Sequence, residues 1–200
     1  MTLIQIQSIG QFLTYYKTDL YYIKRFQDFK LNPDNLSNYI KKDVGSFYSF
    51  LIEFKVVRNF TRGNVHKLLE ETLSWINSKN SDNVDLFAER LSQSDLTRGN
   101  VTTSMASKIL FLNNPWEIIP MDRLARKTLR QKENSYSIYS QKLIHFRKNN
   151  ELVFDENLAY VNHLIEFIHN DFSSLERLDI ISRNRIIDKL LWTMGNNIIR

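Results

Sequence analysis

The sequence predicts an all-α protein, a two-lobed helical domain, and three observations carry this prediction. Only 5 glycines and 3 prolines occur in 200 residues, so the chain is poor in the residues that make tight turns. Apolar residues recur at helical spacing along almost the whole length. No segment has a convincing strand pattern. Long helices are therefore favoured over a many-stranded sandwich or barrel.

The expected helices follow one another through short connections. The first segment, 3–29, predicts either one helix or two helices with a break near Thr18 or Asp19. Residues 31–34 contain a proline and predict a turn before the next helix. The most loop-like segment, 77–82, is a candidate boundary between two lobes of one domain that spans the chain. Beyond the first segment, helices are expected at 35–58, 65–76, 83–95, 102–113, 121–132, 135–149, 155–170 and 174–195.

Composition excludes several classes of site. The absence of cysteine rules out disulfides, thiolate metal sites and cysteine nucleophiles. The sequence has no run of 18 apolar residues and no secretory leader at its start, so we expect a cytoplasmic protein with no membrane partner. The four histidines have no spacing that suits a metal site, and nucleotide-binding and zinc-hydrolase motifs are missing. We therefore expect neither a metal nor another cofactor.

Positive charge is concentrated in the stretch 98–142. The chain has 27 Lys and Arg against 22 Asp and Glu, a net charge of +5. The stretch alone contains eight basic and three acidic residues, so its net charge equals that of the whole chain. Such a concentration favours a polyanionic partner. The basic residues in question are Arg98, Lys108, Arg123, Arg126, Lys127, Arg130, Lys132 and Lys142.

The string Thr-Arg-Gly-Asn-Val occurs twice, at 61–65 and at 97–101, each time just before an expected helix. One interpretation is purely structural, with the glycine in a turn and the asparagine helping to cap the helix. The other is functional, because backbone N–H groups at a helix start with an arginine beside them form a phosphate site. On the second interpretation Arg98, Gly99 and Asn100 are candidate DNA contacts.

The most informative region is 97–130, where the sequence resembles a known family. A turn leads into a short helix with Lys108, an irregular segment at 113–120 follows, and Pro120-Met-Asp122 opens a basic helix. This order resembles the helix-hairpin-helix DNA glycosylase superfamily, most of all its 8-oxoguanine DNA glycosylase-like branch. The closing segment 185–195, with the pattern Arg-x-x-Asp and a final glycine, looks like that of the small bacterial members.

The resemblance implies a DNA glycosylase with AP lyase activity. In this family a lysine attacks the anomeric carbon of the damaged nucleotide, and an aspartate stabilises the charge that builds on the sugar. Carried over by position, Lys108 takes the place of the nucleophile and Asp122 that of the carboxylate. The residues alone leave another interpretation open, in which Asp122 only caps a helix and Lys108 lies on a solvated face.

The same alternatives exist for the DNA contacts. Arg123, Arg126, Lys127 and Arg130 are spaced as one stripe of an expected helix, which suits phosphate contacts or simply a solvated surface. Trp116 in its proline-bracketed loop suits stacking on a base or plugging a core edge. We therefore expect a duplex DNA-binding protein of the glycosylase type. The alternatives are a non-catalytic helical module that binds DNA or another protein, and a purely structural helical protein.

Overall fold

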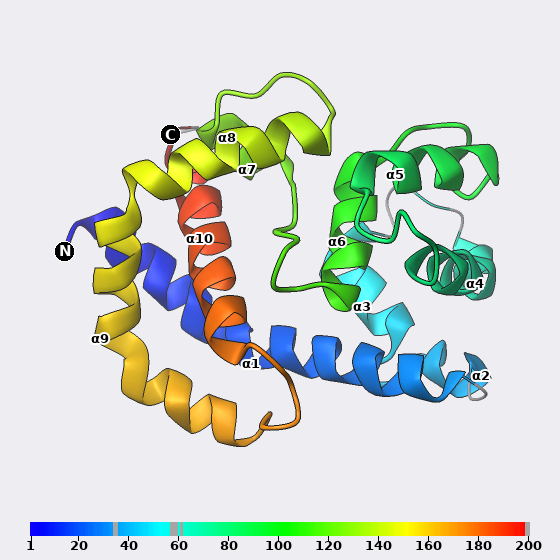
Figure 1. Cartoon of the computed structure of the whole chain (residues 1–200), viewed down its shortest axis with the longest axis horizontal. Helices are drawn as coiled ribbons and strands as arrows, with labels where there is room; N and C mark the ends of the chain where they lie inside the picture. The colour runs from blue at the N-terminus through cyan, green and yellow to red at the C-terminus, as the bar shows by residue number, and fades with distance from the viewer. Residues whose placement is uncertain (34–35, 57–59, 61, 199–200) are drawn as a thin grey trace. The chain divides into compact units, whose positions relative to one another are not determined.

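The computed structural model describes residues 1–33, 36–56, 60 and 62–198, and over these residues the chain is helical without a strand (Figure 1). The all-α prediction is confirmed. The helices, in order, are α1 (Leu3–Leu31), α2 (Leu36–Tyr39), α3 (Phe47–Glu53), the short 3-10 helix η3 (Arg62–Asn64), α4 (Val65–Ile76), α5 (Val84–Gln93), α6 (Thr103–Asn113), α7 (Arg123–Thr128), α8 (Tyr136–Asn149), α9 (Glu151–Asn170) and α10 (Leu178–Asn197).

The chain divides into two compact units, and the first is discontinuous in sequence. Unit 1 combines Met1–Leu20 with Ile119–Arg200, and unit 2 is the intervening Tyr21–Ile118. The long helix α1 contributes its first part to unit 1 and its last part to unit 2. The segment 77–82, expected to separate two lobes, lies inside unit 2, between α4 and α5.

Unit 1 is organised around α10, which packs against α7 and α9 (Figure 1). Its core takes large side chains from α1, α8 and α9, including the fully buried Phe12, Tyr139 and Phe154. From α10 itself Ile181 and Leu191 are fully buried as well. The apolar spacing predicted for 174–195 therefore marks the side of α10 that holds the unit together.

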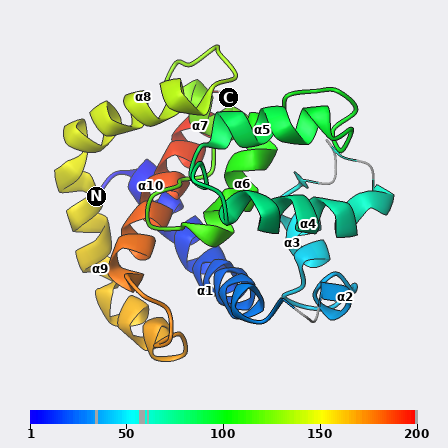
Figure 2. The same cartoon turned by 45° about the vertical axis from the view of Figure 1, so that its right-hand side comes forward.

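Unit 2 is organised around α6, with α5 beside it and α4 in contact with both (Figure 2). Its other half is an aromatic cluster in which Tyr22, from α1, packs edge-on against Phe50 and Phe54. All of the residues Ile109–Leu112 of α6 are buried, which accounts for the short apolar run seen in the sequence.

The single helix expected at 35–58 is wrong, because the chain turns between α2 and α3. Gly45 lies in this turn with φ of +76°, where a side chain is strained. A Cβ there would also lie 2.3 Å from the ring of Tyr21, so the position needs glycine. Ser46 then caps α3 by accepting a hydrogen bond from the N–H of Ser49. The ends of the expected helix, and part of the turn at 31–34, lie outside the described residues.

Of the two alternatives for the first segment, the single helix is the one found, since α1 runs without interruption from Leu3 to Leu31. Asp19 is a buried charged residue with a partner in α10 and not a helix end, as set out below. Each helix of the described residues is either too short or too polar to cross a lipid bilayer.

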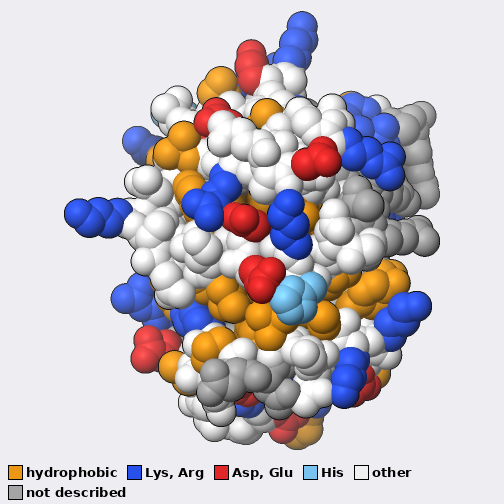
Figure 3. Space-filling model, turned by 90° about the vertical axis from the view of Figure 1, so that its right-hand side faces the viewer, with side chains coloured by type: hydrophobic (Ala, Val, Ile, Leu, Met, Phe, Trp, Pro, Cys, Tyr) orange, Lys and Arg blue, Asp and Glu red, His pale blue; other side chains and the backbone are white. Residues whose placement is uncertain are grey.

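Side chains on the right-hand side of Figure 1, which carries α2, α4 and α5, mix both signs of charge (Figure 3). Basic and acidic groups alternate there, and apolar patches separate them. The charges that do pair on unit 2 include Arg90 with Glu71 at 2.7 Å and Lys24 with Asp28 at 2.8 Å.

Candidate nucleic-acid interface

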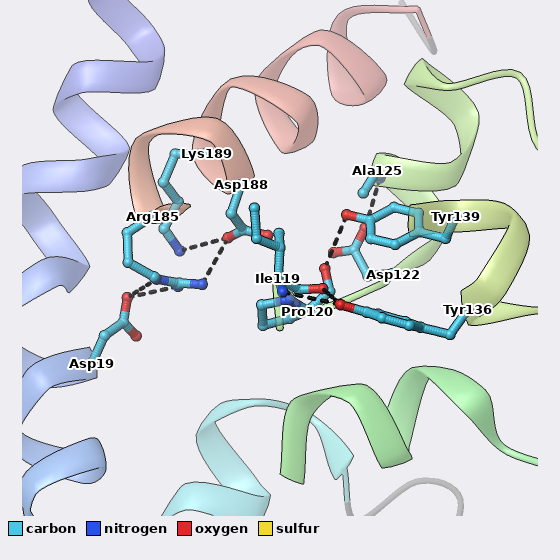
Figure 4. Close-up of polar contacts among 10 residues, drawn as sticks. All are labelled: Asp19, Ile119, Pro120, Asp122, Ala125, Tyr136, Tyr139, Arg185, Asp188 and Lys189. Carbon is cyan, nitrogen blue, oxygen red and sulfur yellow. Dashed lines mark hydrogen bonds and ion pairs between the residues drawn. The ribbon is translucent and has the colours of Figure 1, made fainter. Parts of the chain in front are cut away.

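Two tyrosines of α8 hold the segment that precedes α7, at Ile119 and Pro120 (Figure 4). The hydroxyl of Tyr136 accepts a hydrogen bond from the N–H of Ile119 and donates one to its carbonyl, both at 3.1 Å. The hydroxyl of the fully buried Tyr139 donates to the carbonyl of Pro120 at 3.3 Å. These bonds satisfy polar backbone in a buried irregular segment and hold the chain two residues before Asp122.

Asp122 begins α7 as a helix cap. Its Oδ1 accepts a hydrogen bond of 2.8 Å from the N–H of Ala125, and its backbone is extended, as the capping residue requires. Asp122 therefore caps α7, and its catalytic role stays a prediction. The bond engages one carboxylate oxygen and holds the side chain in a single orientation.

Helix α7 is fastened along its length to α10. The hydroxyl of Thr128 donates to the carbonyl of Leu191 at 2.7 Å. Gly195 lies so close that a Cβ there would be 2.2 Å from the carbonyl oxygen of Leu124. Gly195 thus permits the backbones of α7 and α10 to touch, and α10 gives α7 a rigid support.

The helix expected at 121–132 is wrong in length, because α7 ends at Thr128. The N–H of Arg130 bonds to the carbonyl of Lys127, and the N–H of Gln131 bonds to that of Arg126. This pair of bonds is the Schellman motif, which puts the residue after the cap in the left-handed conformation. That residue is Arg130, with φ of +50°. Glycine is the residue usually found there, so an arginine is held in a conformation that its side chain disfavours.

The loop between α7 and α8 is held by cationic and amide side chains that bond to its carbonyls. One guanidinium nitrogen of Arg126 reaches the carbonyls of Lys132 and Glu133, at 3.4 and 3.2 Å. The ammonium of Lys142 donates to the carbonyl of Arg130 at 2.9 Å, and Gln131 donates to the carbonyls of Glu133 and Ser135, both at 2.8 Å. The predicted stripe therefore has two roles, because some of its cations shape the loop that presents the others.

Charge within unit 1 is strongly polarised. The segment 122–148, which contains α7, the loop and α8, has eight basic residues against two acidic ones. In the rest of unit 1 the acidic residues outnumber the basic ones, nine to six. Arg123, Arg130 and Lys132 are exposed. We call the set of Arg123, Arg126, Lys127, Arg130, Lys132 and Lys142 the α7–α8 basic surface.

Deeper in unit 1, a buried group of charges joins α10 to α1 (Figure 4). Arg185, whose side chain is 3% exposed, pairs with Asp19 at 2.6 Å and with Asp188 at 3.1 Å. Burial alone would lower the pKa of Arg185, but the two carboxylates raise it above its ordinary value. Lys189 lies 3.8 Å from Asp188 and 4.8 Å from the ring centre of Tyr15. Burial, assisted by the charge of Arg185, lowers the pKa of Lys189.

Sequence reasoning missed this group as a unit. In the sequence, Arg185 and Asp188 stand out only as members of the closing segment. Asp19 stands out only as a place where the first helix could break. The signal that could have found Asp19 is its position within an apolar helical segment, since a carboxylate that is to be buried needs a cation.

The remaining candidate site residues belong to unit 2. The ammonium of Lys108 is half-buried and donates to the carbonyl of Phe54, the C-terminal cap of α3, at 2.8 Å. This carbonyl ends a helix, so the lysine stabilises the helix end. Trp116 is half-buried in the turn after α6. Asp122 and the α7–α8 basic surface belong to unit 1.

The repeated pentapeptide adopts two different structures. In the first copy, whose Thr61 lies outside the described residues, Arg62–Asn64 is a 3-10 helix, and Asn64 makes no side-chain cap bond. In the second copy Arg98 and Gly99 have φ of +52° and +72°. Asn100 donates back to the carbonyl of Thr97 and does not cap α6, which begins after Thr102. Arg98, Gly99 and Asn100 are all exposed.

Comparisons of the chain with protein-family models, with curated proteins and with solved structures find no match. The site is thus interpreted from its own geometry. Within the described ranges, no three His, Asp or Glu side chains are grouped so that they could hold a metal ion. At this place unit 1 offers a group of cations on α7, α8 and the loop between them, together with the carboxylate that caps α7.

Proposed function

We propose that this protein binds duplex DNA through the α7–α8 basic surface. The proposal is supported by the charge of 122–148, which has eight basic residues against two acidic ones, and six of the eight form the α7–α8 basic surface. Lysine and arginine that neutralise backbone phosphates release counterions from DNA, and this release is the main source of affinity that does not depend on base sequence.

The observation that carries the proposal is the state of Arg130. It occupies a left-handed position at which glycine costs less, and its backbone carbonyl is held by Lys142. Residues held in such backbone conformations cluster at functional sites, and Arg130 is the one of the five described non-glycine residues with positive φ that lies on the α7–α8 basic surface. The guanidinium is exposed beside Lys132 on a loop whose carbonyls are already satisfied. Little ordering of the loop is then needed when a phosphate binds.

A duplex suits this surface better than a single strand. Proteins that bind single strands stack bases on exposed aromatic rings. The two tyrosines nearest to α7 have other roles, since Tyr139 is fully buried and the hydroxyl of Tyr136 holds Ile119. The surface offers cations for a phosphate backbone, which is how proteins position themselves on a duplex.

The test is a fluorescence anisotropy titration of a labelled duplex of about twenty base pairs at several salt concentrations. In the triple variant Arg123→Gln, Arg130→Gln and Lys132→Gln, three phosphate contacts are lost, so the slope of log affinity against log salt should fall by about 2.7. The charge-matched control is Lys41→Gln, Lys42→Gln and Lys79→Gln, all exposed on unit 2, which should leave the slope unchanged. If the slope fell equally in the two triple variants, DNA binding would depend on total charge and not on the α7–α8 basic surface.

Base excision is the second candidate function, and Asp122 is the observation that favours it. A carboxylate at a helix start is stabilised in its ionised form, as stabilisation of a positively charged sugar requires. In the reaction that the resemblance implies, the deprotonated amine of Lys108 attacks the anomeric carbon. The base leaves with the electrons of the glycosidic bond, and opening of the sugar ring gives a protonated imine. The amine must first leave the carbonyl of Phe54.

Borohydride trapping on duplexes with abasic or oxidised-guanine sites separates the catalytic from the non-catalytic interpretation. A glycosylase and lyase should give a covalent adduct that is lost in Lys108→Ala, while Lys67→Ala, which removes a surface amine bonded to the carbonyl of Ser94, keeps it. Asp122→Asn should slow adduct formation and retain duplex affinity. Saturable binding with no adduct assigns the protein to the non-catalytic class.

A further inference from the structure

A second feature of unit 1 is a pocket formed by the end of α8, the start of α9 and the middle of α10. Its volume is about 360 Å³, at the lower end of the range for small-molecule sites. The apolar part of its wall comes from Phe154, Ile180 and Ile187. Phe154 and Ile187 are buried, and Ile180 is 38% exposed, so the apolar wall continues to the opening.

The polar part of the wall is cationic. Arg147, Lys148 and Arg183 line the pocket together with a single carboxylate, that of Glu151. This set belongs to neither the α7–α8 basic surface nor the buried group around Arg185. A wall with an excess of positive charge over an apolar base is complementary to a small organic anion.

Both guanidinium groups are oriented by neighbours. Arg147 donates to the side-chain oxygen of Asn184 at 2.6 Å, and Asn184 is itself 3% exposed. This bond orients the guanidinium at the wall of the pocket. Arg183 donates to Asp155 at 2.6 Å and lies 3.8 Å from Glu151. Side chains that are positioned before the ligand arrives lose less entropy on binding.

We propose that this pocket binds a small organic anion, a compact apolar body that carries one phosphate, sulfonate or carboxylate group. The anionic group lies against Arg147 and Lys148, since a guanidinium accommodates two anionic oxygens side by side. The apolar body covers Phe154, Ile180 and Ile187. The proposal does not depend on DNA binding, because neither Arg147 nor Arg183 is part of the α7–α8 basic surface.

The experiment is a fluorescence titration of the full chain with anilinonaphthalene sulfonate, an aromatic sulfonate that brightens in apolar surroundings. We expect saturable binding of one probe per chain, with competition by phenyl phosphate or by phenylacetate showing which anionic group the pocket prefers. Arg147→Gln removes a charged hydrogen-bond donor and should weaken binding about ten- to a hundredfold. Lys79→Gln, on unit 2, makes the same charge change and should alter binding less than twofold.

Two further variants keep the proposal falsifiable if Arg147→Gln disturbs folding. Ile180→Trp fills the opening from a partly exposed position and should also abolish probe binding. Phe167→Ser removes an apolar side chain of α9 that is 70% exposed and lies outside the lining of the pocket, and it should have no effect. Loss of binding in Phe167→Ser, with wild-type binding in Ile180→Trp and Arg147→Gln, would overturn the assignment, as would no saturable binding to the wild-type chain.

Discussion

Replacement of Gly195 by alanine tests the packing that supports the basic helix. Gly195 lies inside α10 in an ordinary helical conformation, so the backbone accepts alanine. The added Cβ would lie 2.2 Å from the carbonyl oxygen of Leu124 and 2.8 Å from its carbonyl carbon. Both atoms are backbone, so the contact cannot be relieved by rotating a side chain, and the two helices must separate by roughly 1 Å to restore an ordinary contact.

The size of the effect follows from three opposing contributions. Alanine has a higher helix propensity than glycine, which stabilises the variant by about 1 kcal/mol. Overpacking a close contact costs about 1 to 3 kcal/mol. Separation of the helices also weakens the bond from Thr128 to the carbonyl of Leu191, which contributes about 1 kcal/mol. The net expectation is destabilisation by about 2 kcal/mol, or a fall in Tm of roughly 4 to 8 °C for a chain of this size.

The assay is urea unfolding followed by circular dichroism, with Gly10→Ala as the matched control. Gly10 lies within α1 with no atom within 4 Å of its ideal Cβ position, so the control removes the clash and keeps the propensity gain. It should stabilise the protein by about 0.5 to 1 kcal/mol. If Gly195→Ala were to stabilise the protein as much as Gly10→Ala does, the close approach of α7 to α10 would be refuted. The folded variant should also bind duplex DNA more weakly, because α7 moves.

Three further predictions concern the same unit. Arg130→Gly should raise the free energy of unfolding by about 1 kcal/mol and lower duplex affinity, whereas a loss of stability would contradict the strain at this φ of +50°. Asp19→Asn removes a negative charge that pairs with the buried guanidinium of Arg185, so the free energy of unfolding measured in urea should fall by about 3 kcal/mol. A fall below about 1 kcal/mol would show that the pair does not stabilise the fold. Burial lowers the pKa of His169, whose Nε2 lies 2.6 Å from the hydroxyl of Tyr16. Because the folded pKa is below the unfolded value of about 6.5, stability is highest above that pH and falls on acidification. His169→Gln should flatten this part of the pH profile, and an unchanged profile would assign it to other groups.

Local signals in the sequence were sufficient for most of the helices and for one part of the site. The helix expected at 65–76 has those bounds in the structure, because its apolar spacing is strong and a turn precedes it. Capping by Asp122 was one of the two interpretations that the residues left open, and a cap depends only on the residue and the N–H groups two or three positions later. Such features can be predicted because all the interacting atoms lie within one helical turn.

Other features depended on partners far away in sequence. The turn at Gly45 is decided by the ring of Tyr21, so the apolar pattern of 35–58 could not reveal it. The end of α7 at Thr128 was hidden because an arginine, and not a glycine, occupies the left-handed position. At Gly45 the neighbour is distant in sequence, whereas at Arg130 the motif is local and the residue type conceals it.

The sequence alone determined that this chain is helical, where its positive charge is concentrated, and that a carboxylate opens the basic segment. Only the tertiary structure decided that Asp19 meets Arg185, 166 residues away, that Lys108 bonds to the carbonyl of Phe54, and that a cationic pocket opens beside α10. The reason is physical. Helix periodicity and capping are set by neighbours along the chain, whereas burial of a charge or the shape of a pocket depends on which distant side chains the fold brings together.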